Sequence, residues 1–191
     1  MRKHLGTVLA VAGMIAAPAI AQAQARGATA MASHGKEFGV DIGVGYVSPS
    51  GGQSSFGLTA PFGDIRIGFP STGSMSFEGR FSGSFASGGG TFITFDPGVN
   101  LMFGMGHATS YNDNKYFTVG ADVNIISQSP SGGTSTSGAV FTINGGVGTR
   151  MPWGTAAKRA ELFVSYSLKN TTLGVPNTFG IGARLGLSFW H

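Results

Sequence analysis

The stretch TFGIGARLGLSFW, from Thr178 to Trp190, decides the fold because its apolar side chains recur at every second position. From Phe179 to Phe189 the odd positions are all apolar, while the even positions carry Gly, Arg or Ser. A period of two places the two sets on opposite faces of a β-strand. A tilted strand crosses a bilayer with about 9–11 residues, which is the length of this stretch. The sequence therefore predicts a membrane-crossing strand here.

The same alternation recurs along the chain, with short segments rich in Gly, Ser and Pro between the alternating stretches, and no helical period appears among them. We predict an all-β protein, an eight-stranded antiparallel up-and-down transmembrane β-barrel over residues 38–191. Residues 47–61 and 106–114 are expected to be loops, and Pro97 is expected to mark a β-bulge. The other predicted strands cover residues 38–46, 62–69, 75–86, 91–105, 115–127, 137–150 and 159–168.

The first 25 residues are typical of a signal peptide. Arg2 and Lys3 precede a short apolar core, and A-x-A sites end at Ala23 and Ala25. The alternative, an N-terminal membrane anchor, is disfavoured because the core is too short to span a bilayer as a helix. We predict export through residues 1–25, a flexible segment at 26–37, and a final location in the bacterial outer membrane.

The composition is unlike that of a protein with an ordinary water-facing surface. Only 10% of the residues are charged, where soluble domains have about 25%. Glycine makes up 33 of the 191 residues, which suits a tightly curved wall, and cysteine is absent. The formal net charge is only +4, with no cluster of Lys and Arg, so we expect no nucleic-acid partner. No cofactor is expected either.

Alternation alone leaves open which face meets lipid, because a soluble barrel also alternates and buries its apolar face. Three features favour an outward apolar face. Aromatic residues gather near both ends of the strands, as in the two girdles of membrane barrels. The polar face is otherwise built of Gly, Ser, Thr and Asn. Most charges also share that polar face: Asp41, Asp64, Arg66, Glu78, Arg80, Asp96, Asp122, Arg150, Arg159, Glu161, Lys169 and Arg184.

Six of these charges are predicted to form ion pairs inside the barrel. A hairpin symmetric about Thr72 places Arg66 opposite Glu78 and Asp64 opposite Arg80. A second hairpin, symmetric about residues 172–173, places Glu161 opposite Arg184. Eight strands enclose room only for side chains or one small ligand. We therefore expect a lumen plugged by polar and charged side chains.

The leader, the eight alternating segments and the pattern from Phe179 to Trp190 together resemble the small outer-membrane barrels of the OmpA/OmpX type. The resemblance implies periplasmic termini, contact with outer-membrane lipid, and passing contacts with periplasmic chaperones and the barrel-assembly machinery. It also implies that Phe189 and Trp190 form the C-terminal assembly signal, although His191 follows them here.

Barrels of this kind have diverse activities, so several functions are weighed. The favoured one is a structural or surface-interaction role. The alternative is a narrow channel for small or apolar solutes, and the third is a lipid A-modifying enzyme. His34, His107 and His191 would all lie on the periplasmic side, whereas such enzymes act at the outer leaflet. We therefore predict no enzyme activity and no catalytic, cofactor-binding or metal-binding residues.

Overall fold

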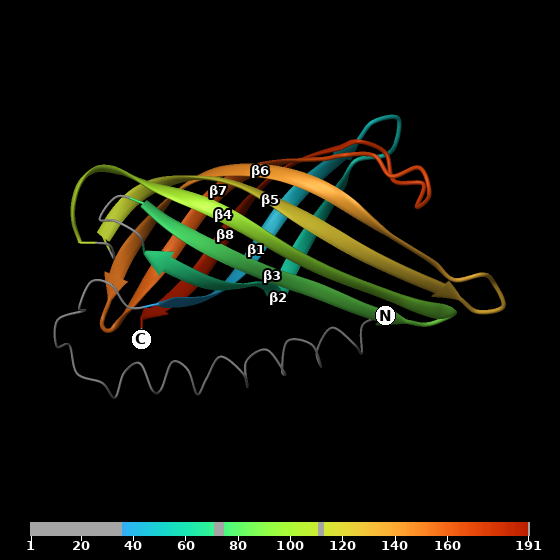
Figure 1. The fold of residues 1–191 in the computed structure, drawn as a ribbon, viewed down its shortest axis with the longest axis horizontal. Helices are drawn as coiled ribbons and strands as arrows, with labels where there is room; N and C mark the ends of the chain where they lie inside the picture. Colours follow the sequence, from blue (N-terminus) through green and yellow to red (C-terminus); the bar gives the residue numbers. More distant parts are fainter. Residues whose placement is uncertain (1–35, 71–74, 111–112, 191) are drawn as a thin grey trace.

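The computed structural model describes residues 36–70, 75–110 and 113–190, and they form a single β-sheet (Figure 1). The predicted signal peptide at 1–25 lies outside the described residues. So does the predicted flexible segment at 26–37, except for its last two residues. Among the residues described, no helix is long and apolar enough to cross a membrane.

The sheet closes into a barrel because each strand pairs antiparallel with the next and the last strand pairs with the first. The seam between the first and last strands runs without a shift from Glu37 opposite Trp190 to Pro49 opposite Thr178. The predicted eight-stranded, up-and-down antiparallel barrel is thus confirmed. The strands are β1 (Glu37–Pro49), β2 (Ser55–Pro70), β3 (Met75–Ser87), β4 (Gly90–Ser110), β5 (Asp113–Pro130), β6 (Thr136–Trp153), β7 (Ala156–Ser167) and β8 (Thr178–Trp190).

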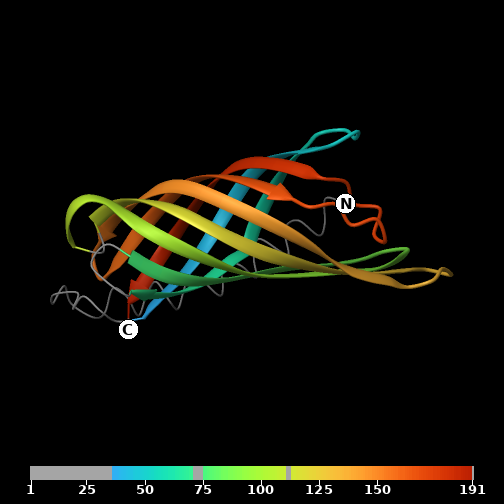
Figure 2. The same cartoon turned by 45° about the horizontal axis from the view of Figure 1, so that its top comes forward.

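The barrel has two different ends. The terminal end carries Glu37 and Trp190, and the loop end carries the connections from β1 to β2, β3 to β4, β5 to β6 and β7 to β8. The hairpins β3–β4 and β5–β6 reach furthest at the loop end (Figure 2). Gly88 and Gly89 alone join β3 to β4, and their φ angles of 142° and 74° are ones that glycine adopts readily.

Several strands are longer than the sequence predicts. The expected loop at 47–61 is wrong in extent, because β1 continues to Pro49 and β2 already begins at Ser55. The expected loop at 106–114 is likewise mostly strand, since β4 ends at Ser110 and β5 begins at Asp113. Gly, Pro, Asn and Asp have a low strand preference of their own, and pairing with neighbouring strands overrides it.

The expected bulge at Pro97 is also wrong. Phe95 lies opposite Ile125 and Gly98 lies opposite Asp122, so the register between β4 and β5 is the same on both sides of the proline. Proline cannot donate to the ladder, and the pairs on either side hold the register. The register shifts instead between Asp41 and Gly43, where β1 pairs with β2, and between Met105 and Ser110, where β4 pairs with β5.

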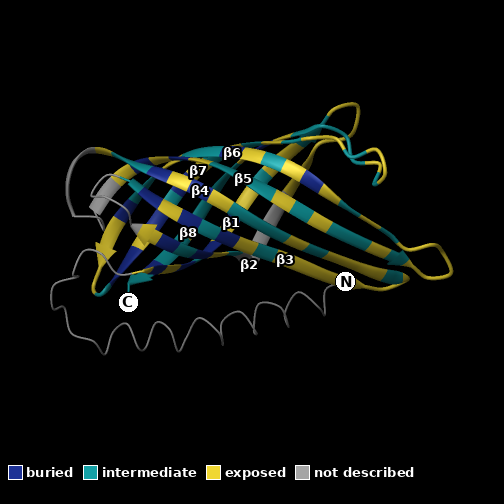
Figure 3. Cartoon of the chain, viewed as in Figure 1, coloured by how far each residue is buried: buried dark blue, intermediate teal, exposed yellow. Residues whose placement is uncertain are grey.

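Buried and exposed residues alternate along the strands (Figure 3), and the large apolar side chains belong to the exposed set. Leu162 is 63% exposed and Ile143 is 51% exposed, whereas Arg66 and Arg150 are 0% exposed. A soluble barrel would bury the apolar set and expose the charges. The charged core therefore lies in the lumen, and the apolar face covers the outside of the wall.

Candidate functional site

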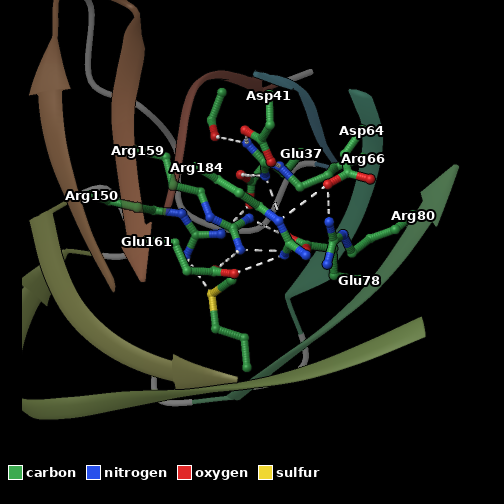
Figure 4. Close-up of polar contacts among 12 residues, drawn as sticks. Glu37, Asp41, Asp64, Arg66, Glu78, Arg80, Arg150, Arg159, Glu161 and Arg184 are labelled. Atoms are coloured by element: carbon green, nitrogen blue, oxygen red, sulfur yellow. Dashed lines mark hydrogen bonds and ion pairs between the residues drawn. The ribbon is translucent and has the colours of Figure 1, made fainter. Parts of the chain in front are cut away.

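The lumen is packed with charged side chains toward the terminal end of the barrel (Figure 4). They come from five strands, and none is more than 3% exposed. We call this cluster the plug. It consists of Glu37, Asp41, Arg66, Glu78, Arg150, Arg159 and Glu161.

Arg66 on β2 is the centre of the plug. Its Nε and Nη2 donate to the two carboxylate oxygens of Asp41 at 2.5 and 3.0 Å, which is a bidentate pair. Its Nη1 donates to Glu37 at 2.9 Å and to Glu78 at 3.3 Å, and Nη2 also donates to the Ser188 hydroxyl at 3.2 Å. One guanidinium thus links three carboxylates and both sides of the barrel seam.

A glycine makes room for this arginine. Gly39 on β1 lies opposite Arg66, and a Cβ atom there would lie 2.5 Å from the guanidinium carbon. No side chain larger than hydrogen fits at that distance. The glycine-rich lumen face of β1 is therefore a packing requirement of the plug as well as a means of curving the wall.

Arg159 on β7 is the second centre. It donates to Glu78 at 2.5 Å and to Glu161 at 2.6 Å. Its Nε donates to the hydroxyl of Tyr116 at 2.5 Å, and that hydroxyl donates to Glu161 at 3.2 Å. The Arg159 guanidinium also lies 5.0 Å from the centre of the Tyr116 ring. Tyr116 is fully buried and completes the network from β5.

Arg150 on β6 closes the plug across the lumen. Its Nη2 donates to Glu37 at 2.5 Å, and its Nη1 lies 2.9 Å from the sulfur of Met102. Glu37 therefore bridges Arg66 and Arg150, as Glu78 bridges Arg66 and Arg159. Shared carboxylates join the whole plug into one network.

Three further charges lie at the mid-level of the lumen, and we call them the floor: Asp64, Arg80 and Arg184. Arg80 pairs with Asp64, and Arg184 donates to Glu161 at 2.9 Å and lies 3.4 Å from Asp64. Plug and floor together hold five carboxylates and five guanidiniums. Buried charges persist when they are paired, and here the signs balance.

The three pairs expected from the sequence all meet in the structure, but one register differs. Glu161 lies opposite Arg184, as predicted. In the β2–β3 hairpin, Arg66 lies opposite Arg80, and Glu78 lies opposite Gly68. The expected symmetry about Thr72 is therefore wrong, because β3 is shifted by two residues along β2 from the predicted register. A slip of two keeps every side chain on its own face, so the pairs form diagonally.

Sequence reasoning missed five members of the lumen network. Glu37 falls in the segment predicted to be flexible, 26–37, yet it is the first residue of β1 and is 1% exposed. It shares the parity of Asp41, and that spacing was a signal that could have found it. The sequence predicts Asp41, Arg150 and Arg159 on the lumen face but predicts no partner for them, and it gives no signal for Tyr116.

The predicted assembly signal lies at the seam. Phe189 is opposite Phe38 and Trp190 is opposite Glu37, so these two residues help to close the barrel. Their recognition by assembly machinery remains a prediction. His191 and His34 lie outside the described residues, and His107 lies near the terminal end of β4. The described residues contain no group of three or more His, Asp or Glu that could hold a metal ion.

Toward the loop end the lumen is hollow. A cavity of about 570 Å³ extends from the floor to the upper parts of the strands, and we call it the cup. All eight strands line it, mostly with Ser, Thr, Asn, Asp and Gly. Asp64 and Arg184 of the floor line its lower part.

Comparisons with known proteins agree with this architecture. Neither a family model nor a curated protein sequence matches the chain. Among solved structures, the barrel is similar to Neisserial surface protein A, at 16% identity and a TM-score of 0.59, over 82% of this chain and 97% of that one. It is also similar to Ail, the attachment invasion locus protein of Yersinia pestis, at 12% identity and a TM-score of 0.52, over 82% of this chain and 99% of that one. The chain has the fold of the small eight-stranded outer-membrane barrels.

Proposed function

We propose that the protein is a bacterial outer-membrane barrel with a structural or surface-interaction role, and that its lumen is closed to solutes by the plug. The observation that carries the proposal is the inverted distribution of polarity. Ten charges are paired inside a closed barrel, and the outer wall is apolar. Water cannot solvate that wall well, whereas lipid can.

The outer surface supports a membrane setting. Near the terminal end the outer wall carries several exposed aromatic side chains, including Trp153, and the rings of Phe103 and Phe117 stack 4.8 Å apart. Near the loop end Phe85 is 70% exposed and Phe56 is 72% exposed. Two bands of aromatic residues at the two ends of a barrel fit the two membrane–water interfaces. Outer-membrane lipid is thus the first partner we propose, and chaperones and assembly machinery would act during export.

The plug argues against a channel. A continuous path would have to pass side chains that are almost fully buried and held by shared ion pairs. We therefore place the narrow channel second. An enzymatic role remains the least supported, since the charged groups are used in pairing one another and leave no free nucleophile–base pair in the plug.

Fewer observations support the surface-interaction role than support the structural role in the membrane. One of the similar structures is that of an attachment invasion locus protein, and the role that this name indicates belongs to that protein. In this chain the loop-end connections are short, the longest being residues 168–177, so any contact with a partner would be small.

The proposal is tested with the full chain expressed in a Gram-negative host and then purified in detergent. We expect it in the outer-membrane fraction, with gel mobility that changes on boiling. In planar bilayers we expect little or no ion current. The double variant Arg66→Ala/Asp41→Ala removes one paired cation and one paired anion from the plug, and it should leak more.

The matched control is Asp96→Asn/Asp122→Asn, which changes two charges of the cup and leaves the plug intact. Its current should stay as low as that of the unaltered protein. A protein that stays monodisperse in water without detergent would overturn the membrane assignment. Large and stable conductance in the unaltered protein would move the channel to first place.

A further inference from the structure

We propose that the cup is a binding site for a small organic amine carrying one or two ammonium groups. The inference goes beyond the structural role proposed above and does not depend on it. It rests on the shape of the cup, on its unbalanced charge and on buried acceptor atoms that lack donors.

The shape suits a small ligand. A volume of about 570 Å³ is within the range of small-molecule sites, roughly 300–1,000 Å³. The floor pair of Asp64 and Arg80 closes the lower end, with the plug beneath it. The cup therefore has one way in, from the loop end. Because its walls are paired strands, the site is preformed.

The charge of the cup is negative. Among the described residues four charged side chains line it, and of these Asp64 and Arg184 belong to the balanced floor. The remaining two, Asp96 on β4 and Asp122 on β5, make no ion pair with any residue that the structure describes. Asp122 accepts a hydrogen bond from the amide of Asn144, which is neutral. The five carboxylates below all face guanidiniums, so these two are the exception.

Acceptor atoms without donors point to the same ligand. One oxygen of Asp96, Oδ1, and the side-chain oxygen of Asn124 are buried and have no hydrogen-bond partner among the described residues. Both residues line the cup. A buried acceptor without a donor is costly, and an ammonium group offers three donors and no acceptor. An amine in the cup would neutralise Asp96 and Asp122, and rotation of the Asp96 or Asn124 side chain toward the cup would give its unsatisfied oxygen a donor.

The rest of the lining would hold the carbon chain of such a ligand. Phe163 and Val47 add apolar surface to the cup, while the wall on β4 to β7 carries hydroxyl and amide groups. Arg184 is the only cation that the described residues contribute to the lining. Its guanidinium lies 4.0 Å from the centre of the Phe163 ring, which holds it against β7 and the floor. The acidic wall on β4 and β5 is left for the ammonium group.

The test is isothermal titration calorimetry of 1,4-diaminobutane against the full-length barrel in a zwitterionic detergent at low salt. We expect saturable binding with one site per barrel. The isosteric neutral probe 1,4-butanediol should give no saturable heat. Asp96→Asn and Asp122→Asn should each weaken diamine binding by about tenfold, and the double variant should abolish it. Boiling-dependent gel mobility verifies that each variant is folded.

The matched control is Asp113→Asn at the first residue of β5, at the opposite end of the barrel, which should leave the affinity unchanged. The proposal is overturned if the diamine shows no saturable binding, if the diol binds equally well, or if the double variant binds the diamine like the unaltered protein. A membrane-embedded, non-conducting barrel that binds no diamine would contradict this inference and leave the proposed function standing.

Discussion

The two halves of one lumen differ in how they fill the same barrel. The half at the terminal end places large charged side chains at lumen positions, and all of them are paired and almost fully buried. The half at the loop end places Ser, Thr, Asn and Gly at the equivalent positions, and a cavity of about 570 Å³ remains. Eight strands allow either outcome, and side-chain size decides between them.

This difference assigns separate tasks to the two halves. Paired buried charges rigidify the terminal half, and breaking one pair is costly because its partner is left buried and alone. The cup carries unpaired acceptors, so its variants should change binding more than folding. Variants of similar chemistry placed in the two halves test this contrast.

Truncation at the seam should have the largest effect. Deleting residues 187–191 removes the partners of β1 from Glu37 to Val40 and also removes Ser188, a partner of Arg66. The barrel could then not close at its terminal end, and lipid cannot solvate open strand edges. We expect failed assembly and degradation, measured as loss of the protein from the outer-membrane fraction.

The control for this truncation shortens the other half. Deleting residues 51–53 trims the connection between β1 and β2 at the loop end and leaves both strands intact. Normal levels are expected for this variant. Equal loss of both variants, or normal levels of the truncated one, would refute the view that closure depends on the terminal half.

Removing the central arginine of the plug should have the next largest effect. In Arg66→Ala, Asp41 loses its only ion-pair partner among the described residues, while Glu37 and Glu78 keep Arg150 and Arg159. Breaking a buried pair costs about 3–5 kcal/mol. We expect this loss in the free energy of unfolding, measured by urea titration of the barrel in lipid vesicles through Trp153 and Trp190 fluorescence.

Two companion variants sharpen this prediction. Adding Asp41→Ala to Arg66→Ala should cost less than the sum of the two single changes, because the stranded charge is gone. In the cup, Asp122→Asn should change the free energy of unfolding by less than about 1 kcal/mol, since it breaks no ion pair. Additive costs in the plug would show that these charges do not act as pairs.

The floor should give an intermediate effect. Arg80→Ala removes one partner of Asp64, but Arg184 remains 3.4 Å from that carboxylate and can compensate in part. We expect a loss of about 2 kcal/mol in the same unfolding experiment, below that of Arg66→Ala. The variant Arg80→Ala/Arg184→Ala leaves Asp64 without either cation, and it should lose more than the two single changes combined. If Arg80→Ala lowered the free energy of unfolding as much as Arg66→Ala does, Arg184 would not be compensating for the lost cation.

The periodicity of the sequence was sufficient to predict the wall. Parity alone placed Arg66, Glu78 and Glu161 in the lumen, and the eight strands followed from the same signal. Strand ends were less predictable, because Ser-rich and Gly-rich segments form strand only where a neighbour pairs with them. The loop predicted at 47–61 is too long for this reason, since β1 runs to Pro49 and β2 begins at Ser55.

The ion pairs that cross the lumen could not be predicted from the sequence. Glu37 and Arg150 are 113 positions apart, and their contact depends on how the strands stagger when the barrel closes. The hairpin between β2 and β3 shows the same limit on a small scale. Its register differs by two residues from that of a symmetric hairpin, and only the face on which each side chain lies was predicted correctly.

The smallest expected effect comes from adding one methyl group to either half of the same strand. Gly39 and Gly45 both face the lumen from β1. A Cβ at Gly39 would lie 2.5 Å from the guanidinium carbon of Arg66, whereas a Cβ at Gly45 would meet nothing closer than 3.5 Å. Arg66 cannot move aside, since four side chains hold it and it is 0% exposed.

Gly39→Ala should therefore lower the free energy of unfolding by about 1–3 kcal/mol, the usual cost of overpacking. Gly45→Ala should be within about 0.5 kcal/mol of the unaltered protein, because the added methyl enters the cup and the alanine also restricts the unfolded chain. The same urea titration in vesicles measures both variants. The two substitutions are chemically identical and differ only in the half of the lumen they enter. Equal losses would show that the terminal half is no more tightly packed than the cup, and the division of the lumen into a rigid plug and a receptive cavity would fail.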